Sequence, residues 1–150
     1  MPKMIFVNLP VEDLSRSMAF YSAIGFTNNP RFTNEQAAAM MWSEQISVML
    51  LTHDFWRTFT AKPIVNAKES AQVLLCVSRE NREEVDAMVE AAAANGGRAD
   101  PNKAQETGFM YGRSFEDPDG HIWEPMWMDM AAAATEVNTE ANGAPDQARA

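Results

Sequence analysis

The 150-residue sequence is poor in cysteine and in basic side chains, and it has no long apolar run. A single cysteine, Cys76, excludes an internal disulfide framework and a cysteine-rich zinc site. Twelve basic residues stand against 21 acidic ones, and the resulting formal charge of −9 disfavours binding to nucleic-acid phosphates. No apolar run approaches the roughly 20 residues that a membrane span requires. These shortages predict a protein whose cysteine is in the reduced, thiol form and which binds neither nucleic acid nor membrane.

The start of the chain, residues 1–4, also lacks the basic head and the apolar stretch of a signal peptide. We therefore expect a cytoplasmic location. Hydrophobic residues make up 46% of the sequence and charged residues 22%, which is typical of a folded domain. One domain is expected over residues 1–130, because this length is short for two independent cores. Residues 131–150 are rich in alanine, which predicts a flexible C-terminal tail.

The first half of the domain begins with an apolar, β-rich run over residues 4–10. This predicts a strand that ends at Pro10, because proline cannot donate to a sheet. Asp13 is a suitable N-cap for the helix that follows, and Gly25 is a suitable left-handed stop. Two further strands are predicted, over residues 37–42 and 46–52, followed by a short helix and a crossover over residues 53–71.

The second half repeats this order. A strand over residues 72–77 precedes a helix with the capping-box spacing of Asn81 and Glu84, and Asn95-Gly96-Gly97 ends that helix. Strands over residues 109–115 and 121–128 follow. The shift from Gly25 to Gly97 is 72 residues, which favours a duplicated unit over a chance alternation of elements. The two modules are predicted at about residues 1–68 and 69–130.

The two ends of the domain resemble a known superfamily. The opening run Asn8-Leu9-Pro10-Val11-Glu12-Asp13-Leu14 and the closing run Asp117-Pro118-Asp119-Gly120-His121-Ile122-Trp123-Glu124 are similar to those of vicinal oxygen chelate proteins. This superfamily contains glyoxalase I, bleomycin-resistance proteins, fosfomycin-resistance enzymes and extradiol dioxygenases. The resemblance implies an α+β fold with two paired βαβββ modules, which form a curled mixed sheet around a cleft. It also implies a homodimer, because such clefts are often completed between subunits in this family.

Metal-dependent members of this superfamily place one ligand on the first strand and one on the last strand of each module. Carried over to this sequence, these positions fall on Phe6, on Leu50 (or Met49 if the register slips by one), on Gln72 and on Glu124. Only Gln72 and Glu124 have a side-chain oxygen atom that can bind a metal ion. A catalytic metal needs about three protein ligands. We therefore expect no metal cofactor, with Gln72 and Glu124 as the ligands if a metal is present.

Strand alternation places the candidate site residues on common faces. Asn8 shares a face with Phe6, and Gln72 shares one with Cys76, which is expected to be buried and inert. If these faces line the cleft, Asn8 and Gln72 are candidate ligand-binding residues in a largely apolar cavity. Glu124 is the candidate catalytic acid or base. The alternative is that each of these side chains is hydrogen-bonded to a neighbour and structural.

Arg113 lies between Tyr111 and Phe115 in a predicted strand, and Arg113 and Tyr111 are further candidate ligand-binding residues. The alternative for Arg113 is a side chain that packs on the sheet and extends its charged end into water.

The resemblance predicts a glyoxalase/bleomycin-resistance-like protein that binds a small organic ligand in its cleft without a complete metal site. The acidic charge balance favours a basic or neutral ligand. Whether catalysis accompanies binding stays open; an active enzyme would be a glyoxalase-type lyase or a dioxygenase. The alternatives are a metal-dependent lyase or extradiol-type dioxygenase of the same superfamily, and a catalytically inert structural or regulatory relative.

Overall fold

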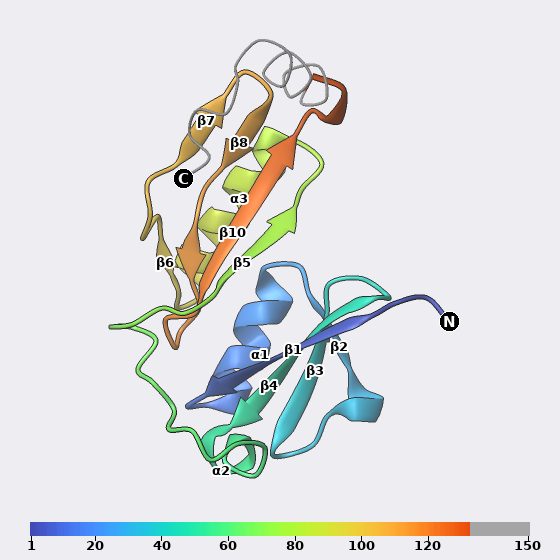
Figure 1. Cartoon of the computed structure of the whole chain (residues 1–150), viewed down its shortest axis with the longest axis vertical. Coiled ribbons are helices and arrows are strands. Elements are labelled where there is room, and N and C mark those ends of the chain that lie inside the picture. Colours follow the sequence, from blue (N-terminus) through green and yellow to red (C-terminus); the bar gives the residue numbers. More distant parts are fainter. Residues whose placement is uncertain (133–150) are drawn as a thin grey trace, which may run out of the picture.

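The structure, a computed structural model, describes residues 1–132 of the chain. The expected tail at 131–150 lies outside the described residues apart from its first two positions. Within the described part, no helix is both long enough and apolar enough to cross a membrane. The secondary structure forms two sheets, one in each half of the chain (Figure 1).

The N-terminal module, residues 5–56, is a four-stranded sheet with one long helix. Its strand order is β1-β4-β3-β2, and only the β1–β4 pair is parallel. This is a βαβββ unit, as the resemblance implied. Its elements are β1 (Ile5–Val11), α1 (Leu14–Ala23), β2 (Thr27–Asn29), the 3-10 helix η1 (Pro30–Phe32), β3 (Ala37–Met41), β4 (Ile46–Thr52) and α2 (His53–Trp56).

The C-terminal module, residues 74–128, repeats this topology with shorter strands. Its first strand, β5, pairs in parallel with its last strand, β10, and β10 pairs antiparallel with β8 and β9. The single strand expected over residues 109–115 is broken into β8 and β9. The elements are β5 (Leu74–Ser78), α3 (Arg82–Ala94), β6 (Arg98–Ala99), β7 (Gln105–Thr107), β8 (Met110–Gly112), β9 (Phe115–Glu116) and β10 (Ile122–Met128).

The helix ends follow the predicted local chemistry. The Asp13 carboxylate accepts a hydrogen bond from the backbone N–H of Arg16, and the Asn81 side chain accepts one from that of Glu84. Gly25 has φ +116°, the left-handed conformation that ends α1. After α3 the left-handed residue within the predicted stop Asn95-Gly96-Gly97 is Gly96, with φ +98°, and not the Gly97 from which the repeat was counted. The repeat between the two glycine stops is therefore one residue shorter than predicted.

The end of β1 differs from the prediction by one residue. The strand continues past Pro10 to Val11. It lies at the edge of its sheet, where proline is tolerated because its missing N–H has no strand to pair with. The Pro10 carbonyl points away from β4 and accepts a hydrogen bond of 2.8 Å from Nε2 of His121, in the other module.

The hydrophobic core lies between the helices and one face of each sheet, and it crosses the junction of the two modules. Tyr21 of α1 is fully buried there and donates a 2.6 Å hydrogen bond to Asp117. The indole of Trp123 in turn donates to the Tyr21 hydroxyl at 3.0 Å. Because Asp117 and Trp123 belong to the second half of the chain, this buried network joins the two modules.

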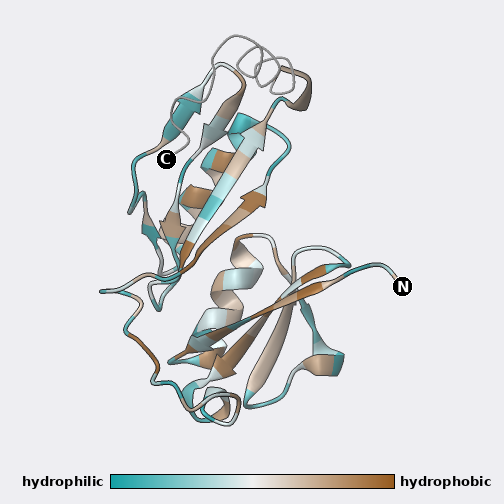
Figure 2. Ribbon diagram, viewed as in Figure 1, coloured by the Kyte–Doolittle hydropathy of each residue, from teal (hydrophilic) through white to brown (hydrophobic). Residues whose placement is uncertain are grey.

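The opposite face of each sheet is left open. On β1 the outward side chains include Phe6, which is 57% exposed, and Asn8. On β5 they include Leu74, which is 51% exposed, and Cys76. Apolar residues are prominent along these strands (Figure 2). The chain therefore covers one face of each sheet with a helix and presents the other face, part of it apolar, to solvent.

Candidate functional site

Two neighbouring hollows lie at the junction of the modules, beneath the connection between α2 and β5. One has a volume of about 470 Å³ and the other about 250 Å³. They share part of their walls, namely Pro10, Ile64, Val65, Ala67 and His121. The two hollows are therefore adjoining compartments, with His121 between them.

The smaller compartment, which we term the apolar hollow, contains two of the predicted ligand-binding residues. Its walls come from β1, α2, the connection 63–73 and the start of β10. The amide side chains of Asn8 and Gln72 line it, and neither has a hydrogen-bond partner among residues 1–132. The indole Nε1 of Trp56, another lining residue, is buried and also lacks a partner there. A mostly apolar wall with a few unpaired polar groups is the usual composition of a small-molecule site.

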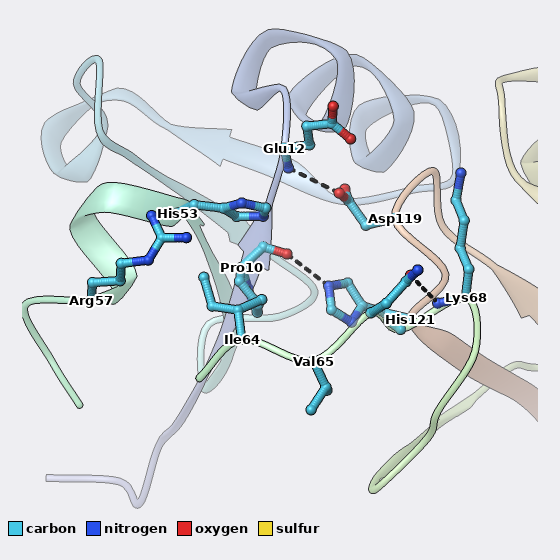
Figure 3. Close-up of a pocket in the computed structure, with 11 residues that line it drawn as sticks. Pro10, Glu12, His53, Arg57, Ile64, Val65, Lys68, Asp119 and His121 are labelled. Carbon is cyan, nitrogen blue, oxygen red and sulfur yellow. Dashed lines mark hydrogen bonds between the residues drawn. The ribbon is translucent and has the colours of Figure 1, made fainter. Parts of the chain in front are cut away.

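The larger compartment, which we term the polar hollow, is lined by charged and imidazole side chains (Figure 3). Hydrogen bonds between side chains and the backbone hold its walls in place. Asp119 accepts a 2.9 Å bond from the N–H of Glu12, and the carbonyl of Pro10 accepts from His121. Because a carbonyl can only accept, Nε2 of His121 carries a proton, which leaves Nδ1 as the second hydrogen-bonding site of the ring. The polar side chains that line this hollow are Glu12, His53, Arg57, Asn66, Lys68, Asp119 and His121.

Glu124 lies elsewhere, on the open face of the C-terminal module. It pairs in register with Cys76, and both line a separate hollow of about 70 Å³ that shares no residue with the apolar hollow. Within one chain the structure therefore does not bring Glu124 together with Gln72.

Cys76 was expected to be buried, and this expectation was wrong, because the open face leaves it exposed. Partial burial raises the pKa of its thiol, and the nearby Glu124 carboxylate raises the pKa further. The thiol form therefore predominates at neutral pH, and Cys76 is not an activated nucleophile.

Tyr111 and Arg113 face α3, on the side of the sheet opposite Glu124. The Tyr111 hydroxyl donates a 2.6 Å hydrogen bond to Asp86 of α3. Arg113 binds three carboxylates, and its hydrogen bond with Asp100, together with those to α3, raises the pKa of its guanidinium. Its side chain is only 15% exposed and already paired, and the residue also contributes to the wall of the hollow that contains Glu124. The structure therefore places both side chains between the sheet and α3, and their role in ligand binding stays a prediction.

The four positions where the superfamily holds a metal do not fit one here. Register decides the choice on β4, because Met49 pairs with Asn8 on the open face, whereas Leu50 is fully buried on the other. Phe6 offers no ligand atom and Met49 only a thioether, which leaves Gln72 and Glu124. Nor do the residues that the structure describes contain a cluster of three His, Cys, Asp or Glu side chains suited to a metal.

The fold and the opening strand match known proteins. The family model described as bleomycin resistance protein-like N-terminal matches residues 3–42. In this segment and in its fold, the chain is similar to the glyoxalase/bleomycin resistance/dioxygenase superfamily. The search of curated proteins finds no match.

Solved structures share the fold over most of the chain. A hypothetical protein from S. aureus is 26% identical, with a TM-score of 0.71 over 85% of this chain and 95% of that one. A glyoxalase/bleomycin resistance protein/dioxygenase family enzyme from Burkholderia phytofirmans is 18% identical, with a TM-score of 0.69 over 85% of this chain and 99% of that one. A fosfomycin resistance protein from Mesorhizobium loti is 11% identical, with a TM-score of 0.63 over 89% of this chain and 98% of that one.

Sequence reasoning missed most of the polar hollow. His53 comes directly after β4, where only a bend returns it toward the molecule, and the short helix α2 supplies that bend. The spacing of His53 and Arg57 was an available signal, because residues four apart lie on one side of a helical turn. Lys68 and Glu12 carried no comparable signal, because loops between elements bring them to the hollow.

Proposed function

We propose that the protein binds a small organic molecule in the apolar hollow, where the amides of Asn8 and Gln72 orient it. The observation that carries this proposal is a mostly apolar cavity of about 250 Å³ with unpaired amide groups in its wall. Buried polar groups without partners are costly, so a ligand that pairs with the Trp56 indole gains binding free energy there. Binding of this kind needs no metal, in keeping with the incomplete ligand set at Phe6 and Met49.

We further propose that the protein is a homodimer. The exposed side chains of Phe6, Leu74 and Cys76 lie on open sheet faces that the chain itself leaves uncovered. Pairing the N-terminal open face of one chain with the C-terminal open face of a second copy would bury these faces and close a cleft between them. Glu124 would then face that cleft, where it would serve as a general acid or base if the protein is an enzyme.

Ligand binding is tested by a thermal-shift screen of aromatic amines, aromatic amides and antibiotics. We expect at least one compound to stabilise the protein and to bind about tenfold more weakly to the Gln72→Ala variant, because one hydrogen bond is lost. Gln36→Ala is the matched control, since Gln36 is exposed and lies outside both hollows. Stabilisation that Gln72→Ala leaves unchanged, or no stabilisation by any compound, would contradict the proposal.

The remaining points are tested separately. Sedimentation should show a dimer at micromolar concentration, and a monomer would refute the shared cleft. Near-stoichiometric zinc, nickel or iron in the purified protein, lost on Glu124→Ala, would favour the metal-dependent alternative.

A further inference from the structure

The polar hollow gathers nitrogen-bearing side chains from three separate parts of the chain. His53 and Arg57 come from α2 and the residue after it, four positions apart, so both turn to the same side (Figure 3). Lys68 comes from the connection to β5, and His121 comes from the turn before β10. All four line the same cavity of about 470 Å³.

Most of the hydrogen-bonding capacity of these groups is unused. The His53 imidazole and the Lys68 ammonium make no hydrogen bond or ion pair within residues 1–132. Arg57 donates one bond, of 3.1 Å, to Asp54 at the exposed rim. Its guanidinium has five N–H donors, so most of them stay free for a ligand.

The acids of the hollow do not neutralise these cations. Asp119 already accepts hydrogen bonds from the Glu12 N–H and from the Ser17 hydroxyl, and Arg16 lies 3.8 Å away from it. The side chain of Glu12 is the one carboxylate of the lining without a partner in the described structure. Lys68 therefore gives the hollow an unpaired positive charge, and Arg57, whose guanidinium pairs with Asp54, keeps most of its N–H donors free.

The two compartments together have room for one ligand that extends through both. Pockets that hold small organic molecules have volumes of about 300–1,000 Å³. The apolar hollow, at about 250 Å³, falls below that range, whereas the polar hollow beside it adds about 470 Å³. Pro10 and His121 line both compartments, so a ligand that is bound against Asn8 and Gln72 and reaches past them has its other end in the hollow that Arg57 and Lys68 line.

We propose that the polar hollow binds the anionic end, a carboxylate or a phosphate, of a ligand whose apolar body occupies the apolar hollow. Arg57 and Lys68 supply the charge, and His53 donates a further hydrogen bond. This inference rests on the proposed function and specifies the ligand class. It departs from the basic or neutral ligand that the net charge favours, because charges lining a site act at closer range than the total charge of the chain.

The test uses three probes with the same aromatic body: naphthoate, naphthyl phosphate and neutral naphthamide. Isothermal titration should show that at least one anionic probe binds about tenfold more tightly than naphthamide, because it gains charge-assisted hydrogen bonds. Tighter binding of the carboxylate or of the phosphate identifies the head group. Equal affinities for all three probes would overturn the anionic subsite and leave the proposed function standing.

The variant Arg57→Gln with Lys68→Gln should abolish the advantage of the anionic probes and leave the naphthamide affinity unchanged. Both residues are exposed, so the fold should tolerate the changes. The matched control is Arg31→Gln with Lys62→Gln, which makes the same change of net charge outside both hollows. If the control reduces anion binding as much as the test variant, the effect belongs to the total charge and the subsite is refuted. No binding of any probe would contradict the proposed function as well.

Discussion

The two modules share one topology but are stabilised by different interactions. The N-terminal module relies on apolar packing, with Met40, Val48 and Leu50 almost completely buried between the sheet and α1. No ion pair joins two residues within 5–56 of the described structure, whereas the C-terminal module contains several. The ion pairs of the C-terminal module are Arg79–Glu84, Arg82–Glu106, Arg98–Glu116 and those of Arg113 with Asp86, Glu90 and Asp100.

The most connected of these ion pairs lie beside the broken strand of the C-terminal module. Arg113 lies between β8 and β9, where its N–H still donates a 3.2 Å hydrogen bond to the Pro125 carbonyl of β10. It binds Asp100, which follows β6, and also Asp86 and Glu90 of α3. The same fold can therefore be stabilised by apolar burial or by charged cross-links, but only the second kind depends on salt and pH.

The largest effect is expected in the apolar module. Leu50→Ala removes a fully buried side chain and should lower the free energy of unfolding by about 3 kcal/mol. Urea denaturation should give the same loss at low salt and at about 1 M salt, because no charge is involved. Ile46→Ala on the same strand is the control; its side chain is 39% exposed, and its loss should stay below about 1 kcal/mol. A strongly salt-dependent loss at Leu50 would break the distinction between the modules.

A smaller, salt-sensitive effect is expected in the charged module. Arg113→Met leaves three carboxylates without their common partner and should lower the free energy of unfolding by about 2 kcal/mol. In about 1 M salt the loss should shrink, since counter-ions screen the remaining acids. Arg31→Met in the other module should cost less than about 0.5 kcal/mol, because this residue is exposed and outside any ion pair of the described structure. An Arg113→Met variant as stable as the parent would show that the cross-link contributes nothing.

The smallest effect is expected on the stability of the fold at low pH. Hydrogen bonds from Tyr111 and Arg113 lower the pKa of Asp86, and a hydrogen bond from Arg113 lowers that of Asp100. Carboxylates with lowered folded-state pKa values stabilise the fold above their usual pKa of 3.8, and this stability is lost as the pH falls below it. Both side chains are nearly half exposed, so solvent screening limits the effect to a fraction of a kcal/mol.

Hydrogen exchange followed by NMR can resolve this effect by module. Below about pH 4, the amides of α3 and β8 should lose protection before those of β3 and β4. A titration of the whole chain is less informative, because burial raises the pKa of Asp117 and gives a pH dependence of the opposite sign. The variant Asp86→Asn with Asp100→Asn should lack the early loss of protection. If the amides of both modules lose protection at the same pH in the parent protein, the two modules do not differ in acid stability.

Local patterns predicted much of the fold. The caps at Asp13 and Asn81 and the positive φ of Gly25 lie where the sequence indicated, because each depends only on neighbouring residues. The buried stripe of α3, which includes Val85, follows in the same way from helical spacing. The break between β8 and β9 was not predictable, since an apolar run does not show where its partner strands stop.

The candidate site was predicted less completely. Strand alternation correctly paired Asn8 with the face of Phe6, and both Asn8 and Gln72 line one hollow. The placement of Glu124 in a different hollow depends on how the two modules pack, which no local pattern contains.

The sequence by itself determined the strand–helix–strands order that occurs twice, the ends of the helices and the alternation of side chains along each strand, because these follow from short-range sterics and hydrogen bonding. Tertiary structure alone decided which groups meet across the chain. It placed Arg113 among the acids of α3, and it brought His53, Arg57 and Lys68 around one hollow. These contacts depend on how segments distant in the sequence pack against one another. Local sequence patterns therefore cannot predict them.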